Sequence, residues 1–225
     1  EGPPVPPAPP GVRDVPVDVP GAMRIDWDRV EMLPPAGSGK ARVIGVVPGQ
    51  IVTLHLQEHV PLSGGRALPD PGRDVLALAV IERHHGLGRV GHGFVRGLGL
   101  RSGALASTVA HDHHNLVVVG ADEGSMWTAA RRCCELGGGL VVARGDEVAA
   151  EVRLSIGGLM SDLPIETVRE QLDQATAAAR QLGASVPDPF MTLSFLALEV
   201  IPELKLTDRG LVDVARFDIV PLWTG

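Results

Sequence analysis

The 225-residue sequence contains no tyrosine, and aromatic residues make up only 3% of it. This scarcity argues against a site of stacked aromatic rings, so any chemistry must come from His, Asp, Glu, Ser and Arg side chains. Positive charge is also scarce, because 20 Lys and Arg face 27 Asp and Glu, giving a net charge of −7. Nucleic acids and anionic membranes favour basic patches, so we expect neither as a partner.

Cysteine and long apolar runs are scarce as well. Cys133 and Cys134 are the only cysteines and are adjacent, so they cannot form a disulfide framework, and we interpret them as small apolar residues on a helix. No run of 18 uncharged apolar residues occurs, which predicts no membrane-spanning helix. The first residues, EGPPVPPAPPG, lack the basic and apolar regions of a signal peptide. Together these features predict a folded cytoplasmic protein.

Proline is concentrated near the N-terminus, where residues 1–40 differ in composition from the rest. Proline removes backbone donors and favours extended chain, so we interpret the proline-rich segment 1–40, and residues 1–20 in particular, as an arm or linker. We expect residues 41–225 to form one α+β (or α/β) domain.

Short runs rich in Val, Ile and Leu predict the strands of this domain. They are ARVIGVV, QIVTLHL, VLALAVIER, ALASTVAH and NLVVVGA, and GLVVARGDEVAAEVRLSI predicts a hairpin that turns at RGDE. The glycine-rich segment 86–103 predicts bends and close backbone approach. We therefore predict mixed sheets with a few packed helices and not a TIM barrel.

Two segments have helical patterns. DEGSMWTAARRCCELGGG is expected to be capped by Asp122 and to end at its glycines. DLPIETVREQLDQATAAARQLG places one apolar stripe along a helix, formed by Ile165, Val168, Leu172, Ala175, Ala179 and Leu182. FMTLSFLALEVIPELKLTDRG is predicted to contain a strand followed by irregular chain.

The segment VAHDHHN holds three histidines and an aspartate between two apolar runs. If the first strand continues to residue 113, His111 and His113 lie on one face and could share a metal, with His114 as a third ligand. Asp112 or Asn115 could then orient an imidazole. A solvated strand end with ordinary histidines explains the composition equally well.

A second polar cluster, ERHHG, also follows an apolar strand. Polar side chains at the ends of two neighbouring strands are what a site at one edge of a sheet requires. Glu82, His84 and His85 could converge with the first cluster, with Glu82 as a carboxylate ligand or base. An exposed strand end is the alternative.

Two further segments carry weaker signals. Ser161 and Asp162 favour a helix cap before Pro164, with substrate binding as the second interpretation. GHGFVRGLGL lacks the strand–glycine loop–helix context of a phosphate-binding motif, so no nucleotide cofactor is predicted.

Several long blocks resemble one family. In order from about Val43 to Val214, they look like the C-terminal half of bacterial and archaeal adenine deaminases. The blocks include VIGVVPGQIVTLHL, VIERHHGLGRVGHGFVRGLGLRSGALASTVAHDHHN, GGGLVVARGDEVAAEVRLSIGGLMSD and DPFMTLSFLALEVIPELKLTDRGLVDV.

The resemblance implies amidohydrolases that convert adenine to hypoxanthine and ammonia at a dinuclear metal centre in a preceding barrel. The matched segments hold no counterpart of that barrel, so the family's main metal ligands do not transfer. The family pattern includes ERHH and His111, Asp112, His114 and Asn115, whereas His113 departs from it. The resemblance also implies a homo-oligomer.

Three hypotheses follow. The chain is part of a deaminase that needs a separate barrel domain or subunit, a stand-alone metal-dependent enzyme on another cyclic C–N substrate, or a non-catalytic purine-binding or subunit-interaction module. For a purine-like substrate we predict catalytic roles for Glu82, His84, His85, His111, Asp112 and His114, and substrate binding by Asn115, Ser161 and Asp162. A divalent Mn, Fe or Zn ion is predicted at His85, His111 and His113.

Overall fold

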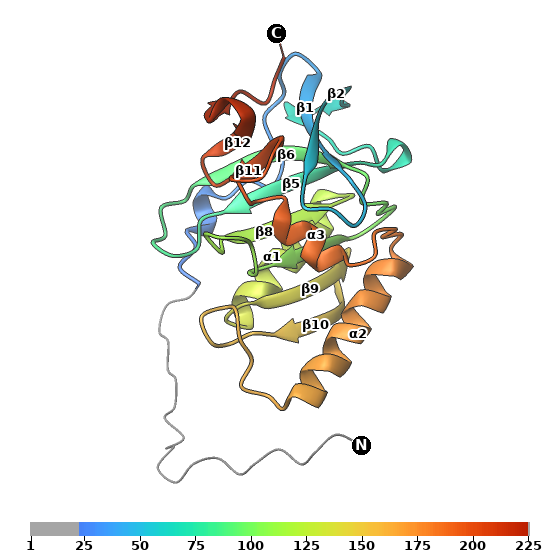
Figure 1. The fold of residues 1–225 in the computed structure, drawn as a ribbon, viewed down its shortest axis with the longest axis vertical. Coiled ribbons are helices and arrows are strands. Elements are labelled where there is room, and N and C mark those ends of the chain that lie inside the picture. The colour runs from blue at the N-terminus through green and yellow to red at the C-terminus, as the bar shows by residue number, and fades with distance from the viewer. Residues whose placement is uncertain (1–22, 225) are drawn as a thin grey trace.

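The apolar runs form one eight-stranded sheet in the computed structural model, which describes residues 23–224 (Figure 1). The strand order is β10-β9-β7-β8-β5-β6-β1-β2. Neighbouring strands are antiparallel except β1 and β6, which are parallel. The strands are β1 (Lys40–Val46), β2 (Thr53–His59), β5 (Val75–Ile81), β6 (Val90–Arg96), β7 (Ala104–Ser107), β8 (Leu116–Gly120), β9 (Gly139–Arg144) and β10 (Glu147–Arg153). The predicted mixed α+β fold without a closed barrel is confirmed.

Smaller sheets complete the β-structure. β3 (Leu62–Ser63) pairs with β4 (Arg66–Ala67), and β11 (Leu204–Thr207), β12 (Gly210–Asp213) and β13 (Asp218–Val220) form a separate sheet. The backbone of this C-terminal sheet comes so close to β6 that a Cβ on Gly91 would lie 1.8 Å from the Thr207 carbonyl oxygen. This confirms the close approach predicted for the glycine-rich segment, although β6 within it was not predicted.

The helices are α1 (Glu123–Glu135), α2 (Ile165–Gln181) and α3 (Pro189–Phe195), with short 3-10 turns η1 (Trp27–Arg29), η2 (Pro71–Arg73) and η3 (Val214–Arg216). As predicted, Asp122 caps α1, accepting the Ser125 backbone N–H at 2.8 Å. Only the second half of the predicted α2 stripe is buried, since Ala175 and Ala179 are inaccessible while Ile165 is 73% exposed. α2 therefore packs through its C-terminal turns.

Helix α3 corrects the strand that we predicted near residue 190. Asp188 accepts the Met191 backbone N–H at 2.9 Å as an N-cap, and Pro189 occupies the first helical position. An aspartate followed by proline starts a helix because the side chain caps a free N–H and proline has none to satisfy. The strand-like composition of FMTLSFLAL concealed this start signal.

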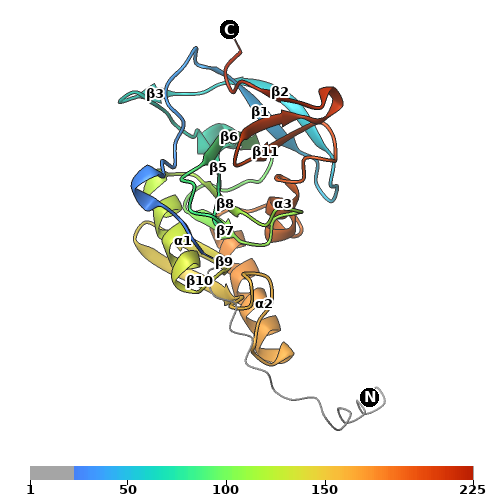
Figure 2. The same cartoon turned by 90° about the vertical axis from the view of Figure 1, so that its left-hand side faces the viewer.

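The helices cover opposite faces of the sheet (Figure 2). Because side chains alternate along a strand, Leu76, Leu78 and Val80 of β5 pack with α2 and α3, whereas Ala77 and Ala79 face α1. Buried residues of α1 include Cys133, whose burial raises the pKa of its thiol to about 12. Cys133 thus packs as an apolar residue, as predicted.

Part of the proline-rich segment packs against the domain. Val30, Met32 and Leu33 are buried in the core on the α1 side of the sheet, while the arm predicted for 1–20 lies outside the described residues. No helix in the range 23–224 is long and apolar enough to cross a membrane.

Candidate functional site

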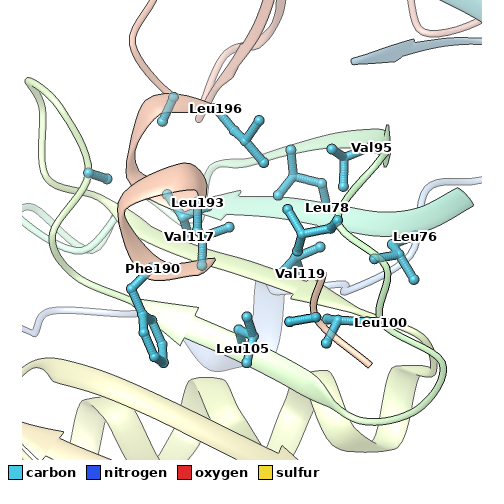
Figure 3. Packing of buried hydrophobic residues seen from close by; sticks show 14 of the residues in the cluster. Leu76, Leu78, Val95, Leu100, Leu105, Val117, Val119, Phe190, Leu193 and Leu196 are labelled. Carbon is cyan, nitrogen blue, oxygen red and sulfur yellow. The ribbon is translucent and has the colours of Figure 1, made fainter. Parts of the chain in front are cut away.

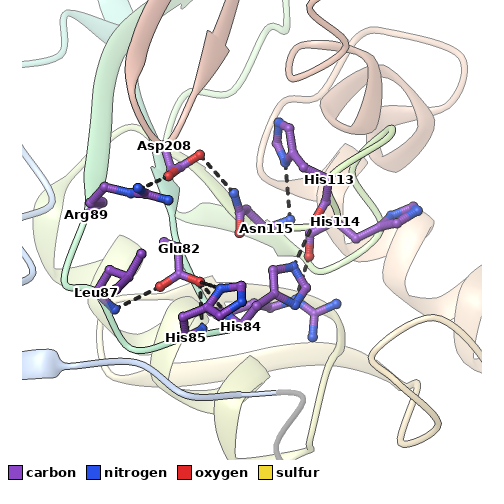
Figure 4. A network of polar contacts seen from close by, with 10 residues as sticks. Glu82, His84, His85, Leu87, Arg89, His113, His114, Asn115 and Asp208 are labelled. Carbon is purple, nitrogen blue, oxygen red and sulfur yellow. Dashed lines mark hydrogen bonds and ion pairs between the residues drawn. The ribbon is translucent and has the colours of Figure 1, made fainter.

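Glu82 begins the first of two histidine-bearing loops, residues 82–89, which joins β5 to β6 (Figure 4). Its carboxylate is 3% exposed and accepts the backbone N–H groups of His84 and His85, each at 2.7 Å, and of Leu87 at 2.9 Å. Burial opposes the charged form, but these donors outweigh it and hold the pKa of Glu82 below its usual value. Glu82 is therefore an ionised group that shapes the loop around itself.

The two histidines of this loop differ in exposure and partners. His85 has a 74% exposed side chain, and its Nδ1 lies 3.2 Å from Glu82 Oε1. His84 turns toward the second loop, where its Nε2–H donates to the His113 carbonyl oxygen at 2.8 Å. Since Nδ1 of His85 donates to the carboxylate, its Nε2 is left to face solvent as an acceptor.

The second loop, residues 108–115, does not continue β7 as predicted. β7 ends at Ser107, and the chain then turns, with the His114 backbone N–H donating to the Ala110 carbonyl at 2.7 Å. Polar side chains compete with strand pairing by bonding to nearby backbone, which ends the ladder here. His111 and His113 therefore do not share one face of a strand, and Asp112 is exposed.

His114 is held as an uncharged donor. The Ala110 backbone N–H donates to its Nδ1 at 3.2 Å, so the ring proton resides on Nε2. Burial, followed by the nearby His111 and Arg83, lowers the pKa of His114. At neutral pH this imidazole can therefore donate a hydrogen bond from Nε2 without carrying charge.

Both loops lie at the same end of β5, β7 and β8, and the structure brings them together (Figure 4). We call residues 82–89 and 108–115 the histidine rim. It gathers all the predicted catalytic residues: Glu82, His84, His85, His111, Asp112 and His114.

Contacts from the C-terminal third surround the second loop. Nδ1 of His111 is hydrogen-bonded to Oγ of Ser194 on α3. Nε2 of His113 lies 3.7 Å from Oε2 of Glu199, too far for a hydrogen bond, and neither atom has another partner among the described residues. Buried polar atoms left this way indicate a place for water or a partner group.

Asn115 has an internal role. Its side chain is buried, and its Nδ2 donates to Oδ1 of Asp208 at 3.2 Å, while Asp208 pairs with Arg89 at 2.8 Å (Figure 4). This bridge joins the second loop, the C-terminal sheet and the first loop. The predicted binding of substrate by Asn115 stays a prediction.

Arg83 holds the two histidine loops in place through buried hydrogen bonds. Its buried guanidinium donates from Nε to the His114 carbonyl at 2.5 Å and from Nη2 to the Gly157 carbonyl at 3.0 Å. Gly158 leaves the space it needs, because a Cβ there would lie 2.9 Å from Nη1. One side chain thus positions the two histidine loops and the 155–160 loop.

Ser161 and Asp162 lie just before α2 but do not cap it. Pro164 is the N-cap residue and makes no side-chain capping bond. Ser161 Oγ instead accepts the Leu163 N–H at 3.2 Å, and Asp162 accepts the Ser155 hydroxyl at 3.0 Å. The predicted cap is wrong, and their role in substrate binding stays a prediction.

The structure does not bring the predicted metal ligands into one group within residues 23–224, and metal binding stays a prediction. No group of three or more His, Cys, Asp or Glu side chains there could hold a metal ion. His85, His111 and His113 instead face Glu82, Ser194 and Glu199 respectively.

Three participants were missed by sequence reasoning. Arg83 sits inside ERHH, so its position was visible but its buried role was not. Ser194 and Asp208 come from segments 80 or more residues away along the chain, and only the signal for α3, the Asp188–Pro189 start, pointed toward Ser194.

The chain is similar in sequence to one protein family and to several curated proteins. The family model for the adenine deaminase C-terminal domain matches residues 50–218. A relative from Desulfatibacillum aliphaticivorans named adenine deaminase is 52% identical over 202 residues, which cover 90% of this chain and 36% of the relative.

Two other relatives of the same name give a similar result. The protein from Oleidesulfovibrio alaskensis is 54% identical over 189 residues, covering 84% of this chain and 33% of the relative. A protein from Cereibacter sphaeroides is 52% identical over 187 residues, covering 83% and 33% respectively. The chain therefore spans about a third of the length of the curated relatives it matches.

Proposed function

Because the chain belongs to the adenine deaminase C-terminal domain family, we propose that it is the C-terminal part of an adenine-hydrolysing enzyme. That enzyme would add water to the amino-bearing carbon of the purine and release ammonia, leaving hypoxanthine. The histidine rim would face the active site of the preceding barrel domain.

The observation that carries this proposal is the convergence of two histidine-bearing loops at one end of the sheet, joined by the 2.8 Å bond from His84 to the His113 carbonyl. A domain that only stabilised its neighbour would not need an ionised buried carboxylate beside an exposed imidazole. The Glu82–His85 pair supports a role in moving protons.

The first described residues of the chain contact the first loop of the rim. The Arg24 backbone N–H donates to the Arg83 carbonyl at 2.7 Å, and Met23 Sδ lies 3.8 Å from Arg83 Nη1.

The rim offers two complementary proton roles. Hydrolysis requires that one proton leaves the attacking water and that another reaches the departing amine. His85 presents Nε2 as an acceptor backed by Glu82, so it could take and return a proton. His114 carries its ring proton on Nε2 without charge and could donate it to a purine ring nitrogen or a developing negative charge.

A divalent Mn, Fe or Zn ion, as the family resemblance implies, does not fit a site within residues 23–224, because no three His, Cys, Asp or Glu side chains there are grouped to hold it. In this proposal the barrel would hold the metal and the rim would act on protons and substrate. The resemblance further leads us to expect self-association in the cytoplasm, which light scattering on the assembled enzyme would measure.

Reconstitution tests the proposal. The chain would be mixed with a truncated Desulfatibacillum aliphaticivorans adenine deaminase that lacks its matching third, and ammonia release from adenine would be measured. We expect activity only in the mixture. His85→Ala and His111→Ala should lower kcat about a hundredfold, whereas the exposed His59→Ala on β2 should not.

A tight complex that releases no ammonia would refute the deaminase proposal and leave a non-catalytic binding module. An active complex in which both rim variants keep full kcat would refute the role of the rim.

A further inference from the structure

His111 is bound through only one of its two ring nitrogens. Nδ1 is hydrogen-bonded to the hydroxyl of Ser194, which is 1% exposed and comes from α3, 83 residues further along the chain. Nε2 has no hydrogen-bond partner within residues 23–224. The two nitrogens are chemically distinct, so a partner on one decides what the other can do.

The ring plane of His111 is constrained as well. It stacks on Phe195 with a centroid distance of 5.1 Å and an interplanar angle of 28°. On another side, the His114 ring lies 5.9 Å away. With a hydrogen bond along one ring edge and an aromatic ring against its face, the imidazole can neither flip nor swing freely.

The element that supplies both contacts is itself anchored. Phe190, Leu193 and Leu196, within and just after α3, pack on the sheet beside Leu105 and Val117 (Figure 3). The Phe195 carbonyl at the end of α3 accepts a 2.9 Å hydrogen bond from the buried Lys205 ammonium. A positive charge suits the carbonyl end of a helix. α3 is therefore a rigid support.

We infer that Ser194 and Phe195 are positioning residues that fix the orientation and tautomer of His111. Because the buried Ser194 hydroxyl has no other acceptor within residues 23–224, it donates to Nδ1, which keeps the ring proton on Nε2 and presents Nε2 at the rim. A reactive group must be held by neighbours that lock its rotamer, and α3 provides such neighbours. Only the catalytic use of this arrangement rests on the proposed function.

NMR of the chain labelled with 15N-histidine tests the positioning without any enzyme activity. The His111 ring signals would be assigned by their loss in His111→Gln. We expect one tautomer in the wild type at alkaline pH and a mixture in Ser194→Ala. Ser194→Thr should restore the single tautomer, because Ser194 lines a cavity of about 150 Å³ that can take the added methyl group.

The matched control is Thr192→Ala on the same helix, whose hydroxyl donates to the Asp188 carbonyl at 2.7 Å. It should leave the His111 signals unchanged. Ring-nitrogen shifts of His111 that are identical in Ser194→Ala and the wild type, with backbone spectra showing a folded protein, would overturn the inference.

Kinetics of the reconstituted enzyme add a second readout. Ser194→Ala should lower kcat roughly ten- to a hundredfold, as for lost orienting partners elsewhere, with KM nearly unchanged. Full kcat in Ser194→Ala would overturn the positioning role in catalysis. If no mixture is active, the deaminase proposal fails, while the NMR comparison still decides whether Ser194 fixes His111.

Discussion

The histidines of the rim are not interchangeable, because His84, His85, His111 and His114 are each held by a different partner. One ring nitrogen of His84 and one of His114 form hydrogen bonds with backbone groups. His85 instead contacts a carboxylate, and His111 a hydroxyl. Hydrogen bonds of this kind set which nitrogen carries the proton. A dense histidine cluster therefore yields separate donors and acceptors.

Glu82 gives a prediction at the residue scale. Its pKa is lower in the folded chain than in the unfolded one, so it stabilises the fold above the unfolded pKa and loses this contribution as pH falls through the folded pKa. Glu82→Gln should lower the free energy of unfolding at pH 7 by about 1–3 kcal/mol, since three backbone donors lose a charged acceptor.

Urea unfolding at pH 7 and at pH 3 measures this effect. The difference in the free energy of unfolding between wild type and Glu82→Gln should be smaller at pH 3 than at pH 7. Glu147→Gln, at the exposed start of β10, should have the wild-type free energy of unfolding at both pH values. An equal difference at both pH values would contradict the prediction.

Residue types were easier to predict than partners. The two polar clusters stood out because they interrupt apolar runs, and Glu82, His84, His85 and His111 all lie on the rim. Ser194 and Asp208 could not be found, because a hydrogen bond across 80 or more residues depends on tertiary packing.

At the scale of elements, one side chain couples three loops. Arg83→Lys keeps the charge but loses the planar fork that reaches His114 and Gly157. We expect the free energy of unfolding to fall by about 2–3 kcal/mol, with NMR shifts changing in both histidine loops.

Arg153→Lys, at an exposed position at the end of β10, is the control and should behave as the wild type. Shift changes confined to the first loop in Arg83→Lys would show that Arg83 does not couple the loops.

Lys205 supports α3 and gives a pH prediction. Burial lowers its pKa from 10.5 to about 8, so the unfolded chain binds its proton more tightly. The cost of burying the charge is present below pH 8 and is relieved as pH rises from about 8 to 10.5. At about 1.4 kcal/mol per pH unit, this relief reaches about 3 kcal/mol.

The alkaline range suits this measurement, because the sequence has no tyrosine and Lys40 is its only other lysine. Cys133 acts in the opposite direction, since its pKa is raised in the folded chain. The quantity to follow is therefore the stability of the wild type minus that of Lys205→Met, which should rise by about 3 kcal/mol between pH 7.5 and 10.5. A stability difference between wild type and Lys205→Met that stays constant across this pH range would contradict the cost assigned to burying the Lys205 charge.

Elements with two consistent signals were predicted well, and those with conflicting signals were not. α1 has a cap, a helical pattern and terminal glycines, and β5 is continuously apolar. β6 was missed because its glycines suggest bends, yet they are there to admit the C-terminal sheet. The segment of α3 was predicted as a strand, because its β-branched and aromatic residues favour strands and the Asp188 helix cap was given less weight.

At the scale of the whole molecule, we propose that the rim is one surface of a larger assembly. Two buried polar atoms, on His113 and Glu199, lack hydrogen-bond partners among residues 23–224, and the rim's histidines form no metal site there. The chain alone should therefore not be stabilised by metal, whereas an independent metalloenzyme would be.

Thermal unfolding of the purified chain, with and without Mn²⁺, Zn²⁺ or a chelator, tests this. A ligand at a hundred times its Kd adds about 2.7 kcal/mol to the stability of a folded protein, which shifts Tm by several degrees. We expect no shift with either ion, and the same Tm for wild type and His111→Ala whether metal is added or removed. A metal-dependent rise in Tm that disappears in His111→Ala but persists in His59→Ala would place a metal site on the rim itself. The barrel would then be unnecessary for holding the ion, and the stand-alone enzyme would replace the deaminase part as the better explanation of the histidine rim.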